Sequence, residues 1–331
     1  MRVRSLPLAA GALAALVPVS FAVTPARADG GGAASFTLTD PRITESSGLA
    51  ASRAHPGVYW THNDSDDGPY LYAVDSRTGK TVATVTLQGV GSPRDVEAIS
   101  MGPGNTLWVG DIGDNRGGTW PYVWIYRLPE PKELRDQTVR ATQYTVKYAD
   151  GPRDAEALMV HPKTGRVYIA DKKEEGGSLW AAPKTLSTGG TNVFRRVADT
   201  GMWVTDGAFS PDGKWLALRS YFGGASFAWN DGRPKRQGRL SVPMQPQGES
   251  LTYAADGSAL MYGSEGDGSR VTARQLRARD GGKGPSQDGS ATGGDAGSGA
   301  GFEGDWKKGA LVMAVALAAV FGLKRLFARR R

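Results

Sequence analysis

Two stretches of the chain carry the same phrase, Asp95-Val-Glu97-Ala-Ile-Ser100 and Asp154-Ala-Glu156-Ala-Leu-Met159, and Pro-Arg precedes both. A weaker copy stands at Gly248-Glu249, and degenerate copies stand at Asp206-Gly207 and Ser47-Gly48. The copies align on five positions separated by 50, 59, 51 and 42 residues, namely Ser47, Glu97, Glu156, Gly207 and Glu249. Periods of this size are typical of solenoids, propellers and other repeat proteins.

Each copy leads into a short apolar run, a turn, and a second apolar run. The second runs are rich in aromatic and β-branched residues: Val58-Tyr-Trp60, Leu107-Trp-Val109, Val167-Tyr-Ile169, Trp215-Leu-Ala-Leu218 and Leu260-Met-Tyr262. Such runs, bounded by Gly, Pro and Asp, indicate strands. A third run follows, and then a fourth in which polar residues alternate: Thr81–Leu87, Thr142–Tyr148, Val193–Val197 and Arg239–Val242. Four antiparallel strands at this period predict a propeller blade.

The sequence therefore predicts an all-β fold, a five-bladed β-propeller over residues 34–279. The alternative is six blades, which requires repeats near 41 residues and a sixth copy that the sequence does not show. A β-sandwich has no reason to repeat one phrase. The fifth repeat is one strand short, so we expect Ala34–Thr39 to pair with the last blade and close the ring, which removes a sheet edge.

Residues 1–28 have the pattern of a secretory signal. Arg2 and Arg4 precede an uncharged stretch, Leu6–Val23, and Ala26-Arg27-Ala28 supplies a small-residue cleavage pattern. The alternative, an uncleaved membrane anchor, is disfavoured because two prolines interrupt the apolar run.

The C-terminal part predicts a tethered membrane anchor. Residues 280–306 are a Gly-rich flexible linker, and Gly309–Leu323 carries no charge. Lysines and arginines beside this run can snorkel, so 307–327 forms a helix of about 31 Å, enough to span a bilayer. The basic tail, residues 328–331, places the C-terminus in the cytoplasm and the larger part outside the cell. A surface-lying amphipathic helix and a wall-sorting signal are the alternatives.

Charge and cysteine content exclude several classes of function. The chain has 40 Lys and Arg against 33 Asp and Glu, but ten of the cationic residues lie in the first 28 and last 25 residues, which contain no acidic residue. The middle is therefore net negative, which disfavours nucleic-acid binding. The chain has no Cys, which excludes disulfides, thiolate nucleophiles and Cys-based zinc sites.

The blade pattern brings two sets of polar side chains to one mouth of the central channel, because a meander's first strand starts where its second strand ends. The first strands begin with Asp95, Glu97, Asp154, Glu156 and Glu249. The second strands end at His62, Asp111, Asp171, Arg219 and Ser264. Arg94 and Arg153 precede the phrase. Asp64, Asp114 and Glu265 lie one to three residues after the ends of the second strands.

Clustered carboxylates need compensation. A hard cation such as Ca²⁺, ion pairs with arginine, or bonds from backbone N–H groups can each provide it. We expect a metal or ligand role for Glu97, Glu156 and Glu249, with Arg94, Arg153, Arg219 and His62 available to bind a ligand. Backbone bonding is an equal alternative for Asp95 and Asp154. A serine triad is disfavoured because no Gly-x-Ser-x-Gly elbow accompanies His62.

The Glu-Ala-Ile/Leu phrase, followed by a Trp and an Asp in the second strand, resembles a loose family of secreted bacterial β-propellers that includes phytase-like, esterase-like, lactonase-type and WD40-like members. The resemblance spans residues 34–279. In hydrolytic members an acidic mouth holds Ca²⁺, which polarises a phosphoryl or carbonyl oxygen. On this chain the resemblance implies Arg219 as an anion clamp and a ligand set of Glu97, Glu156, Glu249, Asp111 and Asp171. Two of the five repeats lack the Glu.

Three functional hypotheses follow. The first is an exported, membrane-anchored module that binds an unidentified extracellular ligand or protein, with a structural cation as an option. The alternative is a Ca²⁺-dependent hydrolase of an ester, lactone or phosphoester, with His62 and Arg219 as candidate catalytic residues. The third is glycan recognition through Trp60, Trp108 and Trp120. No organic cofactor is expected.

Overall fold

The computed structural model describes residues 33–65, 67–277 and 286–287, all of them in the first of the two units into which the chain divides, Met1–Asp288 and Gly289–Arg331. Every regular element among these residues is a strand, which confirms the all-β prediction. Within them, no helix has the length and apolar character needed to cross a membrane. The predicted signal (1–28), anchor (307–327), tail (328–331) and most of the linker lie outside the described residues.

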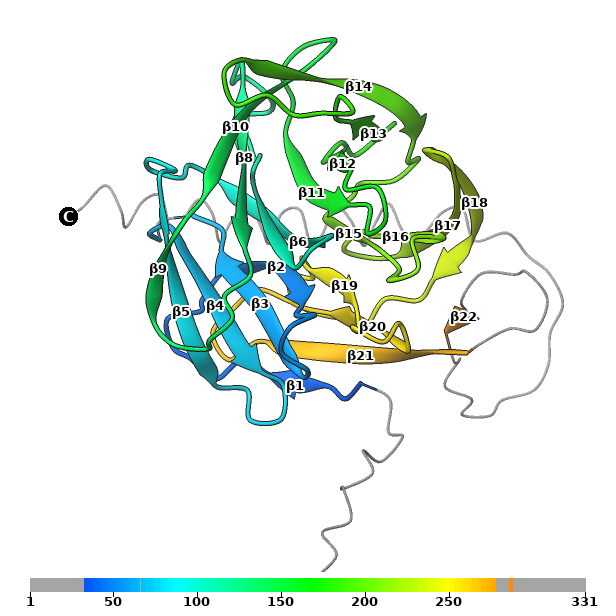
Figure 1. Cartoon of the computed structure of the whole chain (residues 1–331). Coiled ribbons are helices and arrows are strands. Elements are labelled where there is room, and N and C mark those ends of the chain that lie inside the picture. The colour runs from blue at the N-terminus through cyan, green and yellow to red at the C-terminus, as the bar shows by residue number, and fades with distance from the viewer. Residues whose placement is uncertain (1–32, 66, 278–285, 288–331) are drawn as a thin grey trace, which may run out of the picture. The chain divides into compact units, whose positions relative to one another are not determined.

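The strands form successive antiparallel meanders (Figure 1). The first comprises β2 (Ser46–Ala51), β3 (Val58–Asn63), β4 (Tyr70–Asp75) and β5 (Thr81–Gln88). The second comprises β6 (Val96–Gly102), β7 (Thr106–Asp111), β8 (Val123–Pro129) and β10 (Thr142–Tyr148). The third comprises β11 (Ala155–Val160), β12 (Val167–Asp171), β13 (Ser178–Ala181) and β14 (Thr191–Asp199).

Two further meanders complete the described part. One comprises β15 (Asp206–Phe209), β16 (Trp215–Arg219), β17 (Gly224–Asn230) and β18 (Arg233–Leu240). The last comprises β19 (Leu251–Tyr253), β20 (Ala259–Tyr262), β21 (Arg270–Arg277) and the N-terminal β1 (Phe36–Thr37), with β22 (Ser286–Gln287) also paired to β21.

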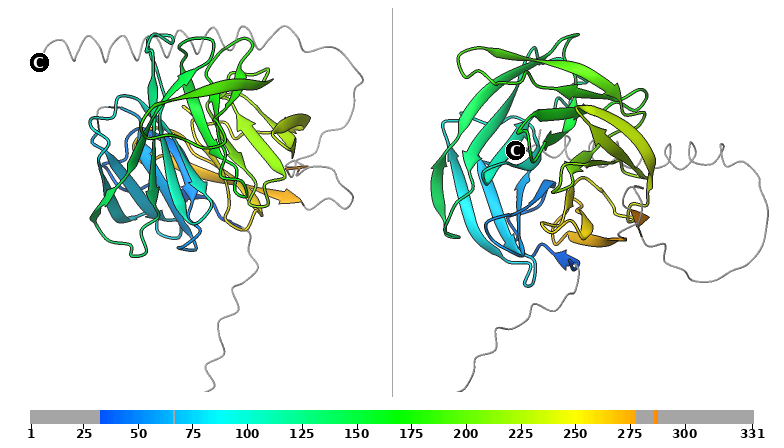
Figure 2. Two further views of the ribbon diagram at one scale, coloured as in Figure 1. Left: turned by 45° about the horizontal axis from the view of Figure 1, so that its top comes forward. Right: turned by 45° about the vertical axis from the view of Figure 1, so that its right-hand side comes forward.

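The first strands of the meanders surround a common axis. β2 contacts β6, β6 contacts β11, β11 contacts β15, β15 contacts β19, and β19 contacts β2 again (Figure 2). Apolar clusters fill the spaces between neighbouring meanders, such as the one that joins Trp60 of β3 to Leu107 of β7 and Tyr126 of β8. This radial packing is the propeller-type fold that the repeated phrase predicts.

Burial along each strand explains why the sequence patterns differ. The inner strands β2 and β11 are buried at every position, and apart from Glu156 they consist of small and apolar residues. The outer strand β5 alternates between buried and more exposed positions, because only one of its faces packs against a neighbour. β10 alternates over most of its length in the same way, whereas β18 is exposed or half-buried at all positions but the last, so the predicted alternation is found in only some of the fourth strands.

The N-terminal strand completes the last meander as predicted. β1 pairs antiparallel with β21, with Phe36 opposite Val271 and Thr37 opposite Arg270. Phe36 is buried, and its ring centroid lies 5.1 Å from that of Tyr59 on β3. The start of the described chain thus joins the last meander to the first.

Three features of the sheets differ from the sequence prediction or were absent from it. An additional strand, β9 (Gln137–Arg140), pairs in parallel with β5, and β10 pairs in parallel with β14. The fourth strand of the fourth repeat is Arg233–Leu240 and not Arg239–Val242. Asp231 and Gly232 both have positive φ, 44° and 82°, and form a two-residue hairpin turn that sets this register.

Two of the tryptophans proposed for glycan recognition belong to the core, which corrects that hypothesis. Trp60 is fully buried, and its Nε1 donates to Glu130 Oε1 at 2.9 Å. Trp108 is only 6% exposed and stacks on Tyr144. Their large apolar area stabilises the spaces between meanders and is not available to a sugar.

The closure by β1 predicts a large stability cost for Phe36→Ala. Removing a buried Phe side chain costs about 3–5 kcal/mol of unfolding free energy. Val82→Ala, at an exposed position of β5, is the control, with an expected change within about 0.5 kcal/mol. Urea denaturation monitored by circular dichroism measures both. Equal stability of the two variants would contradict a structural role for β1.

Candidate functional site

The mouth is the edge of the ring at which the second strands end and the first strands begin. In four of the five meanders a recurring backbone bond joins a residue one to three positions after the second strand to a residue before the first strand. Asp64 N donates to Glu45 O at 2.9 Å, Gly113 N to Asp95 O at 3.2 Å, Lys172 N to Asp154 O at 3.0 Å and Glu265 N to Gln247 O at 2.9 Å. The residue that makes this bond at the mouth is thus an Asp, a Gly, a Lys or a Glu, depending on the meander.

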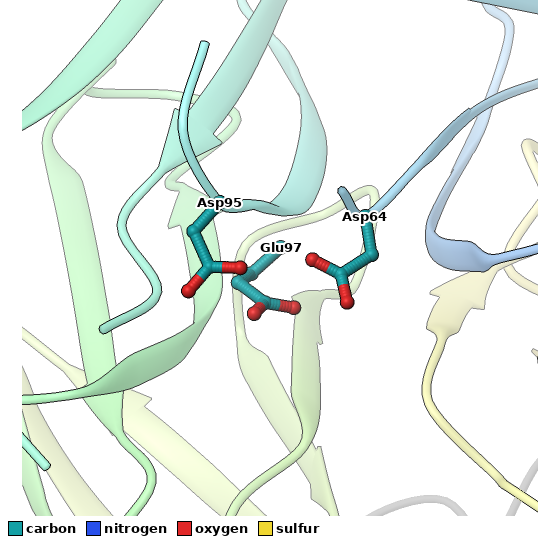
Figure 3. Close-up of side chains that lie close together, drawn as sticks. All are labelled: Asp64, Asp95 and Glu97. Atoms are coloured by element: carbon teal, nitrogen blue, oxygen red, sulfur yellow. The ribbon is translucent and has the colours of Figure 1, made fainter. Parts of the chain in front are cut away.

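Three carboxylates from the first two meanders meet at this mouth (Figure 3). Asp64 follows β3, Asp95 precedes β6, and Glu97 lies on β6. One oxygen from each lies within 4.8 Å of the others. Asp95 and Glu97 are 3% and 4% exposed, so water screens their charges poorly. We call Asp64, Asp95 and Glu97 the acidic group.

Burial and mutual repulsion oppose ionisation of the acidic group. Burial, with the charges of Asp95 and Glu265, raises the pKa of Asp64 to about 9. Burial also raises the pKa of Asp95. Burial, followed by the charges of Glu156 and Asp64, raises the pKa of Glu97 well above its usual range. Without a bound cation, the group therefore retains protons at neutral pH.

The surroundings of the acidic group leave ligand positions open. Asn115 Nδ2 donates to both Asp95 oxygens at 3.1 and 3.0 Å, and Ser47 Oγ donates to Glu97 Oε2 at 3.0 Å. Asp64 Oδ1 is buried and accepts no hydrogen bond from the described residues. A Cβ at Gly113 would lie 2.5 Å from Glu97 Oε1 and 2.6 Å from Asp95 Oδ2, so only glycine allows these carboxylates to occupy their positions.

A second polar group lies on the third to fifth meanders and contains its own cation. Lys172 Nζ pairs with Glu156 Oε1, and Tyr221 OH donates to Glu249 Oε1 at 2.9 Å. Burial lowers the pKa of Lys172, but Glu156, Tyr221 and Glu249 reverse this and hold it well above its usual range. The charge of Glu156 acts on those of Glu97 and Glu249, so the three carboxylates lie near one another. Glu156 differs from the acidic group because Lys172 pairs with it, although burial still raises the pKa of Glu156 well above its usual range.

Asp111 and Asp171, two of the expected metal ligands, do not join the acidic group. Asp111 accepts bonds from the backbone N of Arg94 and Asp95 at 3.2 and 3.0 Å, and from Tyr126 OH at 2.5 Å. Asp171 accepts bonds from Ser178 N at 2.7 Å and Trp180 Nε1 at 3.0 Å. Both carboxylates tie neighbouring strands of one meander together. The backbone-bonding alternative also applies to the two aspartates for which it was given, because Asp114 N donates to Asp154 Oδ1 at 2.8 Å and Asn115 N to Asp95 Oδ2 at 3.3 Å.

His62 and Arg219 are too buried to act on a substrate in this conformation. His62 is 1% exposed, its Nδ1 bonds to Asn63 O at 3.0 Å, and burial lowers its pKa to about 4. Arg219 is fully buried, and its Nη1 donates to Ser250 O and Gly263 O, both at 3.0 Å. Arg219 therefore links the fourth meander to the fifth, and it does not present a clamp to the mouth.

Arg94 and Arg153 occupy equivalent stacked positions. The Arg94 guanidinium lies 3.9 Å from the ring centroid of Trp120 and 3.8 Å from that of Trp124. The Arg153 guanidinium lies 3.7 Å from the Trp180 centroid, and its Nη1 pairs with Asp171 at 2.9 Å. Cation–π stacking explains why both repeats place Arg before the Asp of the phrase and Trp in the third strand.

Sequence reasoning missed Lys172 and Tyr221, and it placed Asp64 outside the main cluster. Lys172 directly follows the conspicuous Asp171, and Asp64 stands one register position after β3, where Lys172 stands after β12. The sequence analysis aligned only the last residues of the second strands. Aligning the residues that follow these strands as well would have found Asp64 and Lys172, but not Tyr221.

Comparisons with known proteins give similarities of fold only. No protein-family model and no curated protein sequence matches the chain. Among solved structures, a putative 6-phosphogluconolactonase from Bacteroides uniformis is 12% identical over 73% of this chain and 70% of its own, with a TM-score of 0.40. The PQQ-bound aldose sugar dehydrogenase from Streptomyces coelicolor is 10% identical over 72% and 97%, with a TM-score of 0.43. A chain of a nidogen/laminin complex is 15% identical over 67% and 73%, with a TM-score of 0.42.

Proposed function

We propose that this protein is an exported, membrane-anchored, five-bladed propeller whose mouth binds an extracellular ligand or protein and holds a Ca²⁺ ion in the acidic group. The blade count is supported by the meanders and by the contacts of their first strands around one axis. Export and anchoring rest on the sequence patterns of residues 1–28 and 307–327.

The exposed apolar side chains at the mouth are the observation that carries the binding function. Among the described residues, six large apolar side chains are conspicuously exposed. Four of them stand on or beside loops at the mouth: Tyr70, Tyr122, Phe222 and Met244 at 37%, 45%, 54% and 88% exposure. Aromatic and Met side chains gathered on one face are typical of interaction surfaces.

The acidic group connects the loops that carry these side chains. Asp64 begins the segment that leads to Tyr70, and Asp95 bonds to Asn115 in the segment that leads to Tyr122. Ca²⁺ takes six to eight oxygen ligands and accepts carboxylates in flexible geometry. An ion at Asp64, Asp95 and Glu97 would therefore hold both loops against β6 and order the mouth.

The alternative hydrolase function has less support. It requires a base and an anion-binding residue that reach substrate, and His62 and Arg219 are 1% and 0% exposed. The cation in our proposal is accordingly structural, and it neutralises the acidic group and orders the binding loops.

Calcium is expected to stabilise the chelator-treated protein, and Glu97→Gln to remove most of this effect. At a Ca²⁺ concentration one hundred times Kd, binding adds about 2.7 kcal/mol to the unfolding free energy, or several degrees in Tm. Glu156→Gln is the matched control, because it removes a buried carboxylate from the group that Lys172 compensates. Differential scanning calorimetry in EGTA and in Ca²⁺ measures the Tm of the wild type and of both variants. An undiminished shift in Glu97→Gln would exclude this ligand set.

The metal-free protein is expected to lose stability as pH rises from 7 to 9. Asp64 titrates near pH 3.9 in the unfolded chain but has a pKa of about 9 when folded. Its proton therefore favours the folded state, and that contribution falls as pH approaches 9, by up to about 1.4 kcal/mol per pH unit for one proton. Urea denaturation in EGTA should show a shallower decline for Asp64→Asn. A wild-type protein whose stability rises over this range would contradict the protonated acidic group.

The mouth, and not the side of the ring, is expected to contact the partner. A photo-crosslinking residue in place of Phe222 should give covalent adducts on intact cells, and these should diminish when EGTA is added. The same residue in place of Val82, on β5, should give none. Immunoblotting of the full-length protein detects the adducts. Equal adducts at the two positions, or none at Phe222, would count against the mouth as the binding surface.

A further inference from the structure

A cleft of about 260 Å³ lies between the second and third meanders, at the edge of the ring opposite the mouth. Its walls come from the β6–β7 turn, from Trp108, Arg127 and Tyr144 on β7, β8 and β10, from the β11–β12 turn, and from residues 182–186 after β13. None of these elements belongs to the mouth, so the cleft is separate from the acidic group.

The charged side chains that line the cleft all have the same sign. They are Arg127, Arg166 and Lys184, and no carboxylate accompanies them among the described lining residues. None of the three forms an ion pair with a described residue. Arg166 is held in place because its Nε donates to Ala182 O at 3.1 Å, which leaves its Nη atoms for another acceptor. Three cations without a counter-charge favour an anion.

The apolar lining of the cleft comes from half-buried Pro103, Pro183 and Leu186 and from the edges of Trp108 and Tyr144, which are 6% and 7% exposed. The rings of Trp108 and Tyr144 stack with centroids 6.0 Å apart and planes 17° from parallel. Trp108 Nε1 donates to Thr106 Oγ1 at 3.1 Å, so the indole N–H is already satisfied. The Arg127 guanidinium lies 5.5 Å from the Trp108 ring centroid. A cation therefore stands directly beside the apolar surface.

The wall that carries Lys184 is fixed to the second meander. Buried Asn192 accepts a bond from Ser187 N at 2.8 Å, and its Nδ2 donates to Ser187 O at 2.9 Å and to Thr145 O of β10 at 3.0 Å. The parallel pairing of β10 with β14 holds the same two meanders together. The cleft is thus formed before a ligand arrives, which lowers the entropic cost of binding.

We propose that this cleft binds a small organic anion that consists of one flat ring and a phosphate or carboxylate group. The ring contacts Pro103, Pro183 and Leu186 and the exposed edges of Trp108 and Tyr144. The anionic group accepts hydrogen bonds from Arg127, Arg166 and Lys184. The volume fits a ligand of one ring, since sites for drug-sized molecules have about 300–1,000 Å³. This site is independent of the proposed cation and of the partner at the mouth.

Isothermal titration of the full-length protein with phenyl phosphate tests the proposal. We expect one site per chain, with binding at least about tenfold tighter than that of inorganic phosphate, which lacks the ring, and no detectable binding of benzyl alcohol, which lacks the charge. Arg127→Gln combined with Lys184→Gln should weaken binding of phenyl phosphate at least about tenfold, because each lost charge-assisted bond removes attraction for the anion.

The matched control is Lys214→Gln combined with Arg233→Gln. These residues are exposed cations of the fourth meander, Lys214 in the β15–β16 turn and Arg233 at the start of β18, and neither lines the cleft, so binding should be unchanged. All four substitutions are at exposed positions, so both double variants should keep the wild-type Tm. Absent binding of phenyl phosphate, equal binding of phenyl and inorganic phosphate, or equal weakening in both double variants would each overturn the proposal.

Discussion

The arrangement of the first strands around one axis is the constraint on which the rest of the structure depends. Each first strand is buried at all or nearly all of its positions and contacts the first strands of the neighbouring meanders. Polar residues at the starts of these strands are therefore forced into a confined space with little water. In such a space every ionised carboxylate requires a partner, because both the loss of hydration and the repulsion between like charges act at full strength. The chemistry of the mouth follows from the ways in which this requirement is met.

Different meanders meet the requirement differently, although their backbones are alike. Asp111 and Asp171 accept backbone and side-chain hydrogen bonds within their own meanders. Glu156 is paired with Lys172, and Glu249 accepts a bond from Tyr221. At the acidic group the residue that makes the corresponding backbone bond is Gly113 on one meander and Asp64 on another, and neither supplies a cation. A local departure from an otherwise consistent repeat is where a functional site is expected. This is why our proposal places the ion at the acidic group and does not extend its ligand set to Glu156 and Glu249.

The repeated phrase was sufficient to predict most of the strands, the ring and the closing role of residues 34–39, because periodic burial leaves a direct trace in hydrophobicity. It did not predict β9, and it misplaced the bounds of β18. It also predicted that Glu97, Glu156 and Glu249 share one wall. It could not show which carboxylates are compensated within the protein, since that depends on contacts between residues distant in sequence, such as Tyr221 with Glu249. Nor could it show that Arg219 points into the core, because a buried and an exposed arginine look the same in a strand pattern. The parallel pairing of β10 with β14 left no signal either, as it joins two ordinary outer strands.

That unpredicted pairing is what separates the two proposed sites in kind. At the mouth, binding depends on loops whose positions an ion would control, so its affinity should vary with calcium. At the opposite edge, β10, β14 and Asn192 fix the walls of the cleft through backbone and side-chain bonds that involve no titrating group. The two sites share only rigid strands, and sites without shared partners contribute nearly additively to free energy. Occupation of the cleft by an anion should therefore leave the calcium response of the mouth unchanged, since neither ligand has a two-state element through which to sense the other.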